Sequence, residues 1–139
     1  MDRVEPNVRS RMMSRIRSKD TIPELRVRRY LHRAGLRYRV HVANLPGAPD
    51  IVFPSRRLCV FVNGCFWHGC RKCRDGQRQA QSNREYWLPK IARNRERDRA
   101  HYRDLRRQGW TVAVIWECET ENEKKLSALR DAISAVTPN

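Results

Sequence analysis

Three of the five cysteines in this chain stand at positions 65, 70 and 73, inside the stretch NGCFWHGCRKC. The spacing C-x4-C-x2-C allows one loop to wrap a tetrahedral zinc ion, which needs a fourth ligand. Cys118 is the leading candidate for that ligand, and His68 competes for the place from within the loop. If Cys118 is the ligand, the fold must bring a distant segment beside the loop. The alternative is a set of ordinary buried thiols.

The charge of the chain is the second strong constraint. Its 139 residues contain 30 basic and 15 acidic side chains, a formal net charge of +15, and all but five of the bases are arginine. Arginine binds phosphate groups in a bidentate manner, so this excess favours a polyanionic partner over a merely soluble basic surface. The chain shows no long apolar run and no signal-like N-terminal segment, so we expect no membrane attachment and a reducing, cytoplasmic location. In that location the cysteines indicate metal ligands or core residues and not a disulfide framework.

Hydrophobic patterning predicts one α/β domain over residues 1–139, with residues 1–19 as a basic arm or short helix. Thr21 is the predicted cap of the first firm helix, Pro23 suits its first turn, and Gly35 ends it. Thr120 is the predicted cap of the last helix. The expected helices are 21–35, 83–107 and 120–136, and the expected strands are 37–42, 49–53, 58–62 and 110–118.

The strand 58–62 is apolar on both faces. A strand of this kind is typical of the centre of a sheet that is covered on both sides. We therefore expect an α/β sandwich with a mixed sheet, and we interpret Cys59, inside this strand, as a core residue.

Polar residues occupy positions on two helices where apolar side chains are expected. Glu24 lies on the inward face of the first helix, and Asn94 and Asp98 interrupt the inward stripe of the long helix. A buried carboxylate is costly unless it is paired or used. Taken singly, Glu24 as a helix-end charge and Asp98 as the partner of an arginine are equally good interpretations.

A third acid, Asp50, begins a strand whose neighbour leads directly into Asn63 and His68. These groups can therefore meet at one edge of the sheet. Converging carboxylates beside a histidine, in a protein this basic, indicate a Mg2+-dependent phosphodiesterase. The carboxylates would hold the metal and the histidine would deprotonate a water molecule.

Four motifs, in order along the chain, carry a resemblance to a known family. They are LPGAPDIVF, FVNGCFWHGC, REYWLPKI.RN.ERD and GW.V.VIWEC, and the matches run from about Asp20 to Cys118. Together they resemble the very-short-patch repair endonucleases, a branch of the restriction-endonuclease-like superfamily. The resemblance implies a three-layer sandwich with a central mixed sheet, helices on both faces and a structural zinc site. It also implies a nickase that cuts the thymine strand at a T·G mismatch, as left by deamination of 5-methylcytosine.

The resemblance further implies roles for individual residues. Asp50 would be the principal Mg2+ ligand, helped by the backbone carbonyl of Val62; His68 would be the general base, with Glu24 and Asp98 in the outer shell. The implied zinc ligands are Cys65, Cys70, Cys73 and Cys118. The implied aromatic wedges in the base stack are Phe66, Trp67 and Trp87, although Trp87 is also a candidate core residue. We add two arginines of the N-terminal arm as DNA-binding candidates, Arg15 and Arg17.

The chain departs from the family's pattern in three places. Asn63 stands where the family commonly has a histidine; it can hydrogen-bond a phosphate oxygen but cannot donate a proton as an imidazolium would. A zinc ligand that is often histidine is Cys70 here, with Cys73 one place further on, which still predicts an all-cysteine site. The central strand lacks the E-x-K pair of the wider superfamily, in agreement with chemistry based on histidine.

Two alternatives share most of these features. A relaxed nuclease of the same fold, acting on other mismatches or on modified DNA, would use the same catalytic residues. A non-catalytic zinc-stabilised DNA-binding protein would share the charge and the aromatics without needing Asp50 or His68. We expect a monomer that binds mismatched double-stranded DNA in the bacterial nucleoid, with mismatch-repair proteins as further candidate partners.

Overall fold

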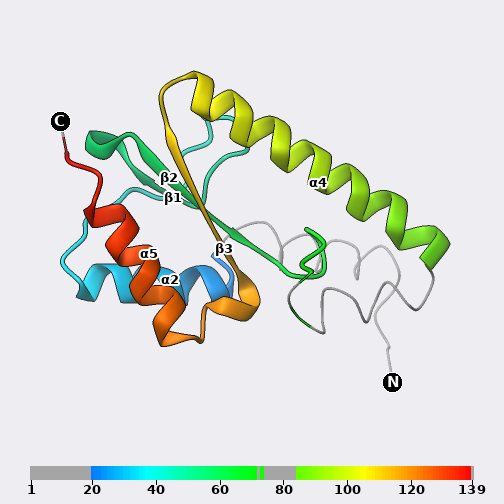
Figure 1. The fold of residues 1–139 in the computed structure, drawn as a ribbon, viewed down its shortest axis with the longest axis horizontal. Helices are drawn as coiled ribbons and strands as arrows, with labels where there is room; N and C mark the ends of the chain where they lie inside the picture. Colours follow the sequence, from blue (N-terminus) through cyan, green and yellow to red (C-terminus); the bar gives the residue numbers. More distant parts are fainter. Residues whose placement is uncertain (1–19, 72, 74–83, 139) are drawn as a thin grey trace.

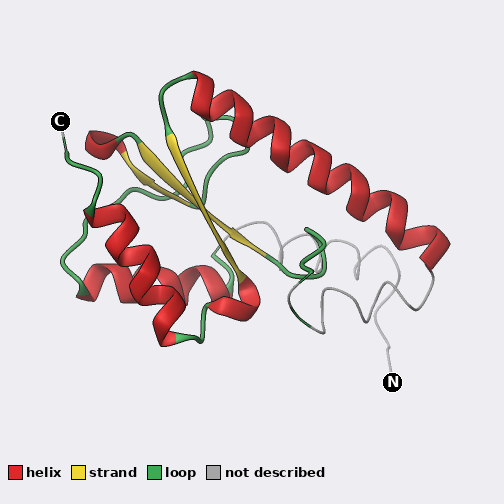
Figure 2. Ribbon diagram, in the orientation of Figure 1, coloured by secondary structure: helices red, strands yellow, loops and turns green. Residues whose placement is uncertain are grey.

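The computed structural model describes residues 20–71, 73 and 84–138 (Figures 1 and 2). The predicted arm 1–19, with Arg15 and Arg17, lies outside the described residues. The elements in chain order are α2 (Ile22–Arg33), β1 (Ile51–Phe53), η1 (Pro54–Arg56), β2 (Leu58–Asn63), α4 (Arg84–Arg107), β3 (Thr111–Trp116), η2 (Glu117–Glu119) and α5 (Glu123–Ser134), where η denotes a 3-10 helix.

The strand β2 is the centre of a three-stranded mixed sheet. It pairs antiparallel with β1 and parallel with β3, in a register that aligns Asn63 with Trp116. All six of its residues are buried. The predicted mixed sheet with an apolar central strand is therefore confirmed.

Helices cover both faces of this sheet (Figure 1). On one face, Leu31 of α2 and Ile133 of α5 belong to a core that includes Val60. On the other face, Leu105 of α4 shares a smaller core with Cys59. Successive side chains of a strand point to opposite faces, so β2 contributes to both cores. Cys59 is fully buried, as predicted. Among the described residues, no helix combines the length and apolar character needed to cross a membrane.

The first helix forms as its sequence predicts. The hydroxyl of Thr21 accepts a hydrogen bond from the backbone N–H of Glu24 at 3.3 Å, and Pro23 lies in the first turn. Gly35, just past the end, has a left-handed φ of +87°. This conformation suits glycine because it has no Cβ.

Three predicted details are wrong. Residues 37–42 do not form a strand: only Arg39 makes a bridge, to Val52, and His41 has a left-handed φ of +59° that breaks the extended path. Thr120 does not cap α5. The cap is Asn122, whose side chain accepts from the N–H groups of Lys124 and Lys125.

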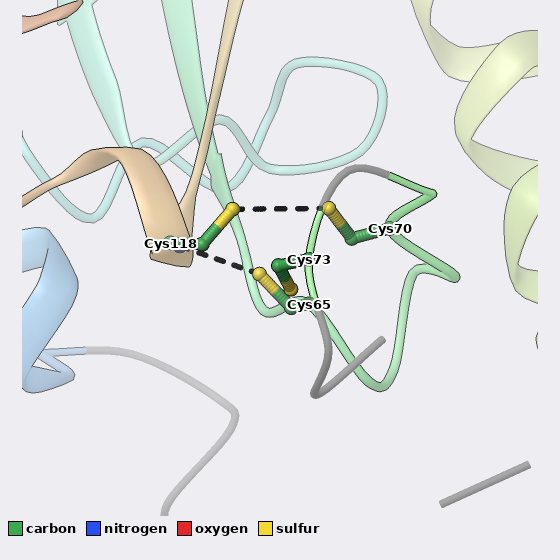
Figure 3. Close-up of side chains that lie close together, drawn as sticks. All are labelled: Cys65, Cys70, Cys73 and Cys118. Atoms are coloured by element: carbon green, nitrogen blue, oxygen red, sulfur yellow. Dashed lines mark hydrogen bonds between the residues drawn. The ribbon is translucent and has the colours of Figure 1, made fainter. Parts of the chain in front are cut away.

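The third difference concerns strand length: β1 begins at Ile51 and not at residue 49, and the last strand is also shorter than predicted. β3 ends at Trp116, and the chain then turns into η2. Cys118 therefore lies in the turn after the strand and not in the strand itself. The turn redirects its side chain toward the loop that follows β2, where the other clustered cysteines lie (Figure 3).

The loop after β2 lies directly against α4. Gly69 in this loop has a φ of +67°, and a Cβ added there would lie 2.6 Å from Cγ2 of Ile91 and 2.9 Å from Cδ of Arg95. Ile91 is itself buried. The loop can therefore approach α4 this closely only because residue 69 has no side chain.

We expect Gly69→Ala to lower the free energy of unfolding more than Gly35→Ala does. Both positions have a left-handed φ, so both substitutions carry backbone strain of about 1 kcal/mol. At Gly35 an added Cβ meets nothing within 4 Å, whereas at Gly69 it collides with α4. The collision should add roughly 1–3 kcal/mol. Urea unfolding of both variants measures the difference, and equal losses would show that the loop withdraws from α4 freely.

Candidate active site

A cleft of about 1100 Å³ opens between the N-terminal end of α2, the sheet and α4. The residues that line it include every catalytic candidate from the sequence: Glu24, Asp50, Asn63, His68 and Asp98. Val62, Trp67 and Trp87 line it as well. These residues come from α2, from the residue before β1, from β2, from the loop after it and from α4. Only the tertiary fold brings them together.

Asp50 lies on the sheet side of this cleft. Its Oδ2 accepts a hydrogen bond from the backbone N–H of Val62 at 2.7 Å. Burial raises the pKa of Asp50 to about 7; the Val62 hydrogen bond opposes this rise, and the neighbouring carboxylate of Glu24 adds to it. Two carboxylates in one partly buried site disfavour each other's ionised forms, and a cation bound between them would reverse that preference.

Glu24 is almost completely buried, with 3% of its surface exposed. Its Oε2 accepts from the backbone N–H of Asp20 at 2.9 Å and from the guanidinium of Arg28 at 3.1 Å. Arg28 also donates to Asp20 at 2.8 Å. These bonds compensate the burial of the carboxylate and fix it beside Asp50.

His68 and Asp98 form a close pair, with Nδ1 of the histidine 2.5 Å from Oδ2 of the aspartate. Their side chains are 30% and 19% exposed, so the pair lies at the wall of the cleft and not deep in the core. An Nδ1–H that donates to a carboxylate leaves Nε2 as the basic nitrogen. Asp98 thus pairs with His68, and the alternative interpretation of Asp98, an arginine partner, finds no such ion pair among the described residues.

The polar interruption in the inward stripe of α4 has a structural explanation. Asn94 donates from Nδ2 to the backbone carbonyl of Trp67 at 2.7 Å. One turn later Asp98 holds His68, and one further turn on, the hydroxyl of Tyr102 accepts from Nδ2 of Asn63 at 2.9 Å. Side chains four residues apart lie on one face of a helix. The stripe therefore holds the end of β2 and the following loop at three points.

The four clustered cysteines form a second site beside the cleft (Figure 3). The sulfurs of Cys65, Cys70, Cys73 and Cys118 all lie within 4.8 Å of one another. Sulfurs at about 2.3 Å from a tetrahedral zinc ion would be roughly 3.8 Å apart, close to the 3.9 Å between Cys70 and Cys118. Within the described residues this is the one compact group of three or more potential metal ligands, and it could hold a metal ion. His68 is not part of it.

The carboxylates of the cleft are arranged differently. Glu24, Asp50 and Asp98 line one cavity, but within the described residues they do not form a cluster as compact as that of the cysteines. Asp50 and Glu24 are the pair that interact directly. Asp98 lies across the cleft with His68.

The three aromatic candidates form one cluster. The ring centroids of Phe66 and Trp67, and of Phe66 and Trp87, are 4.9 Å apart, and those of Trp67 and Trp87 are 5.6 Å apart. All three side chains are half-buried, so Trp87 is not a fully enclosed core residue. Tyr86, which the sequence analysis missed, extends the cluster and is 55% exposed.

Two further features around the cleft were not predicted from the sequence. Glu117 accepts from the backbone N–H of Cys65 at 3.1 Å, a contact that no local sequence signal indicates. The second feature is a basic row on α4 that lines the cleft: Lys90, Arg93, Arg97 and His101. Its members recur at intervals of three and four residues, a helical spacing that could have revealed them.

Comparison with known proteins decides the family. A family model described as "DNA mismatch endonuclease Vsr" matches residues 1–74. This chain belongs to the Vsr family. The resemblance inferred from the motifs is confirmed, and the membership makes the protein an endodeoxyribonuclease.

Known relatives of this chain match most of its length. The Type II nicking enzyme V.XorIIP of Xanthomonas oryzae pv. oryzae is 51% identical over 127 residues, which cover 91% of this chain and 92% of that protein. The Type II nicking enzyme V.NmeAIP of Neisseria meningitidis is 43% identical over 115 residues, 83% of this chain and 81% of that protein. The DNA mismatch endonuclease Vsr of Escherichia coli is 40% identical over 119 residues, 86% and 75% of the two chains.

We expect Asp50→Asn to stabilise the metal-free protein at neutral and alkaline pH. Because the folded state raises the pKa of Asp50 from its ordinary value to about 7, the aspartate lowers stability as the pH rises from about 4 through 7. An amide keeps the acceptor for Val62 without the buried charge, so the variant should gain roughly 1–3 kcal/mol above pH 7 and little at pH 4. Urea unfolding with a chelator, across this range, is the measurement. A variant less stable than wild type at pH 8 would contradict the origin of this pKa.

Proposed function

We propose that this protein is a Mg2+-dependent DNA nicking endonuclease that cuts the thymine strand at T·G mismatches, such as those left by deamination of 5-methylcytosine. One observation carries the proposal: in a chain of the Vsr family, a single cleft joins the Asp50–Glu24 carboxylates to the His68–Asp98 pair. We further propose a single endonuclease domain over residues 1–139 with a restriction-endonuclease-like sandwich fold, acting as a monomer on the DNA of the bacterial nucleoid.

The donor set on the sheet side of the cleft fits Mg2+. Carboxylate and carbonyl oxygens are the ligands that this ion prefers. Asp50 would hold it, with the backbone carbonyl of Val62, while Glu24 and Asp98 would bind water in its outer shell. When bound, the ion supplies positive charge that neutralises the charge developing on the phosphate.

His68 is the proposed general base. Its Nε2 accepts a proton from the attacking water, and the carboxylate of Asp98 stabilises the imidazolium that forms and keeps the ring in position. A partly exposed position at the cleft wall lets water and substrate reach the ring. Asn94 holds the carbonyl of the preceding residue, Trp67, which limits movement of the loop that carries the histidine.

The cysteine cluster is the proposed structural zinc site. Four thiolates satisfy zinc without His68, and they tie the loop after β2 to η2. The aromatics Phe66, Trp67 and Trp87, half-buried beside the cleft, are the proposed wedge. A mismatched pair is cheaper to unstack than a matched one, so inserted rings favour DNA that contains a mismatch.

We expect wild-type protein with Mg2+ to nick the thymine strand of a labelled T·G duplex. Asp50→Ala and His68→Ala should each lower the rate by about 100-fold or more, because one loses the metal ligand and the other the general base. Asp131→Ala is the matched control, since Asp131 lies exposed on α5 and pairs with Arg130. The measurement is denaturing electrophoresis of the two differently labelled strands.

The same assay separates the alternatives. Cutting of a fully paired duplex as fast as of the T·G duplex would overturn the mismatch specificity and favour a relaxed nuclease. If wild type and Asp50→Ala both bind DNA but neither cuts any mismatched duplex, the protein is a DNA-binding module.

We expect the protein to carry about one zinc ion per chain and Cys118→Ser to lose most of it. Cys59→Ala is the matched control, because Cys59 is buried in β2 outside the cluster. Metal content of the purified folded proteins, measured by mass spectrometry, is the readout. Zinc retained in full by Cys118→Ser would exclude the remote cysteine as a ligand.

A further inference from the structure

The contact between Asn63 and Tyr102 has no role in the chemistry proposed above. Asn63 is the last residue of β2 and only 4% exposed, yet it lines the cleft next to Val62. Its amide nitrogen donates to the hydroxyl of Tyr102 at 2.9 Å. The Tyr102 ring packs on Phe61 with a centroid distance of 4.9 Å, which holds the hydroxyl in place.

In the structure this contact turns the amide nitrogen of Asn63 toward Tyr102 on α4. An asparagine side chain has an NH2 group that donates and a carbonyl oxygen that accepts, on opposite branches of one plane. Because α4 engages the nitrogen through Tyr102, the oxygen is the branch left for the cleft. Among the described residues no hydrogen-bond partner occupies that oxygen.

The surroundings of that oxygen suit a cation. Asp50 is anchored to the backbone of Val62, the residue directly before Asn63, and Glu24 lies beside Asp50. Amide carbonyls bind hard divalent cations together with carboxylates and backbone carbonyls. Tyr102 takes one of the two N–H groups of the Asn63 amide, so the role that the sequence suggested for Asn63, a donor to a phosphate oxygen, is the competing interpretation.

We propose that Asn63, oriented by Tyr102, supplies a neutral oxygen ligand to the divalent cation held by Asp50. Tyr102 is then a positioning residue on α4, and the Asn63–Tyr102 pair is part of the cation site. This inference rests on the cation site of the proposed function and adds two residues to it.

The test is direct binding of Mn2+, followed by the loss of the electron paramagnetic resonance signal of the free ion. Asp50→Asn identifies the cleft site, since that variant should lose it. We expect Asn63→Leu and Tyr102→Phe to weaken this site roughly 10-fold, as loss of a ligand or of the residue that orients it does. Tyr30→Phe is the matched control, because its hydroxyl bonds to Glu123 on the surface, away from the cleft.

A rescue experiment separates positioning from a merely structural role. A carboxylate has two equivalent oxygens, so Asn63→Asp presents one to the cation whichever way the group turns. Asn63→Asp should therefore bind Mn2+ at least as tightly as wild type, and adding Tyr102→Phe to it should cost nothing further. Thermal unfolding confirms that each variant is folded.

Three outcomes would overturn the inference. Unchanged Mn2+ affinity in both Asn63→Leu and Tyr102→Phe would do so, and weaker DNA binding by Asn63→Leu alone would then identify Asn63 as a phosphate donor. A tenfold loss when Tyr102→Phe is added to Asn63→Asp would show that Tyr102 acts only through packing. Failure of the wild type to bind Mn2+ in an Asp50-dependent manner would overturn the cation site of the proposed function as well. If Asp50-dependent binding is present but insensitive to Asn63 and Tyr102, only the present inference fails.

Discussion

The parallel pairing of β2 with β3 brings together the two segments from which the cysteine cluster and one edge of the cleft are built. Its register aligns Asn63 with Trp116, so the loop after β2 and the turn η2 leave the sheet at the same edge. Parallel neighbours end together in this way, although the segments are far apart in the chain. There the backbone N–H of Cys118 lies 3.3 Å from the sulfur of Cys65, and Glu117 accepts from the N–H of Cys65. A cysteine cluster begun by the loop after β2 is therefore completed by the turn after β3.

The helix α4 also holds the site together, through hydrogen-bonding side chains at three positions of its inward stripe. Its inward stripe carries Asn94, Asp98 and Tyr102 between the buried Ile91 and Leu105. Each of the three polar side chains bonds to the end of β2 or to the loop that follows it. Three apolar residues would leave the loop without these anchors. The polar residues thus position the aromatic cluster, the histidine and the asparagine relative to one rigid element.

The cleft separates charge within a strongly basic protein. Asp50 and Glu24 lie on one side, where burial makes the ionised form of Asp50 unfavourable. The basic row of α4 lies on the other wall, together with Asp98. In the proposed function the cation relieves the repulsion between Asp50 and Glu24, while the basic row faces the phosphates of DNA. A fold that keeps two carboxylates together without a cation loses some stability, which is a common property of active sites.

Local patterns in the sequence predict most of the helices and strands and identify the chemical groups of the site. The cap at Thr21, the apolar strand β2 and the helical stripe of α4 are local signals, and the motif residues name the family directly. Local signals failed at residues 37–42, where the alternation predicts a strand but His41 adopts a left-handed conformation and only Arg39 finds a partner. Which of these groups meet depends on the tertiary fold, which pairs Asp98 with His68, Tyr102 with Asn63 and Glu117 with Cys65. These contacts join segments distant in the chain, and their geometry depends on how α4 and β3 pack against β2.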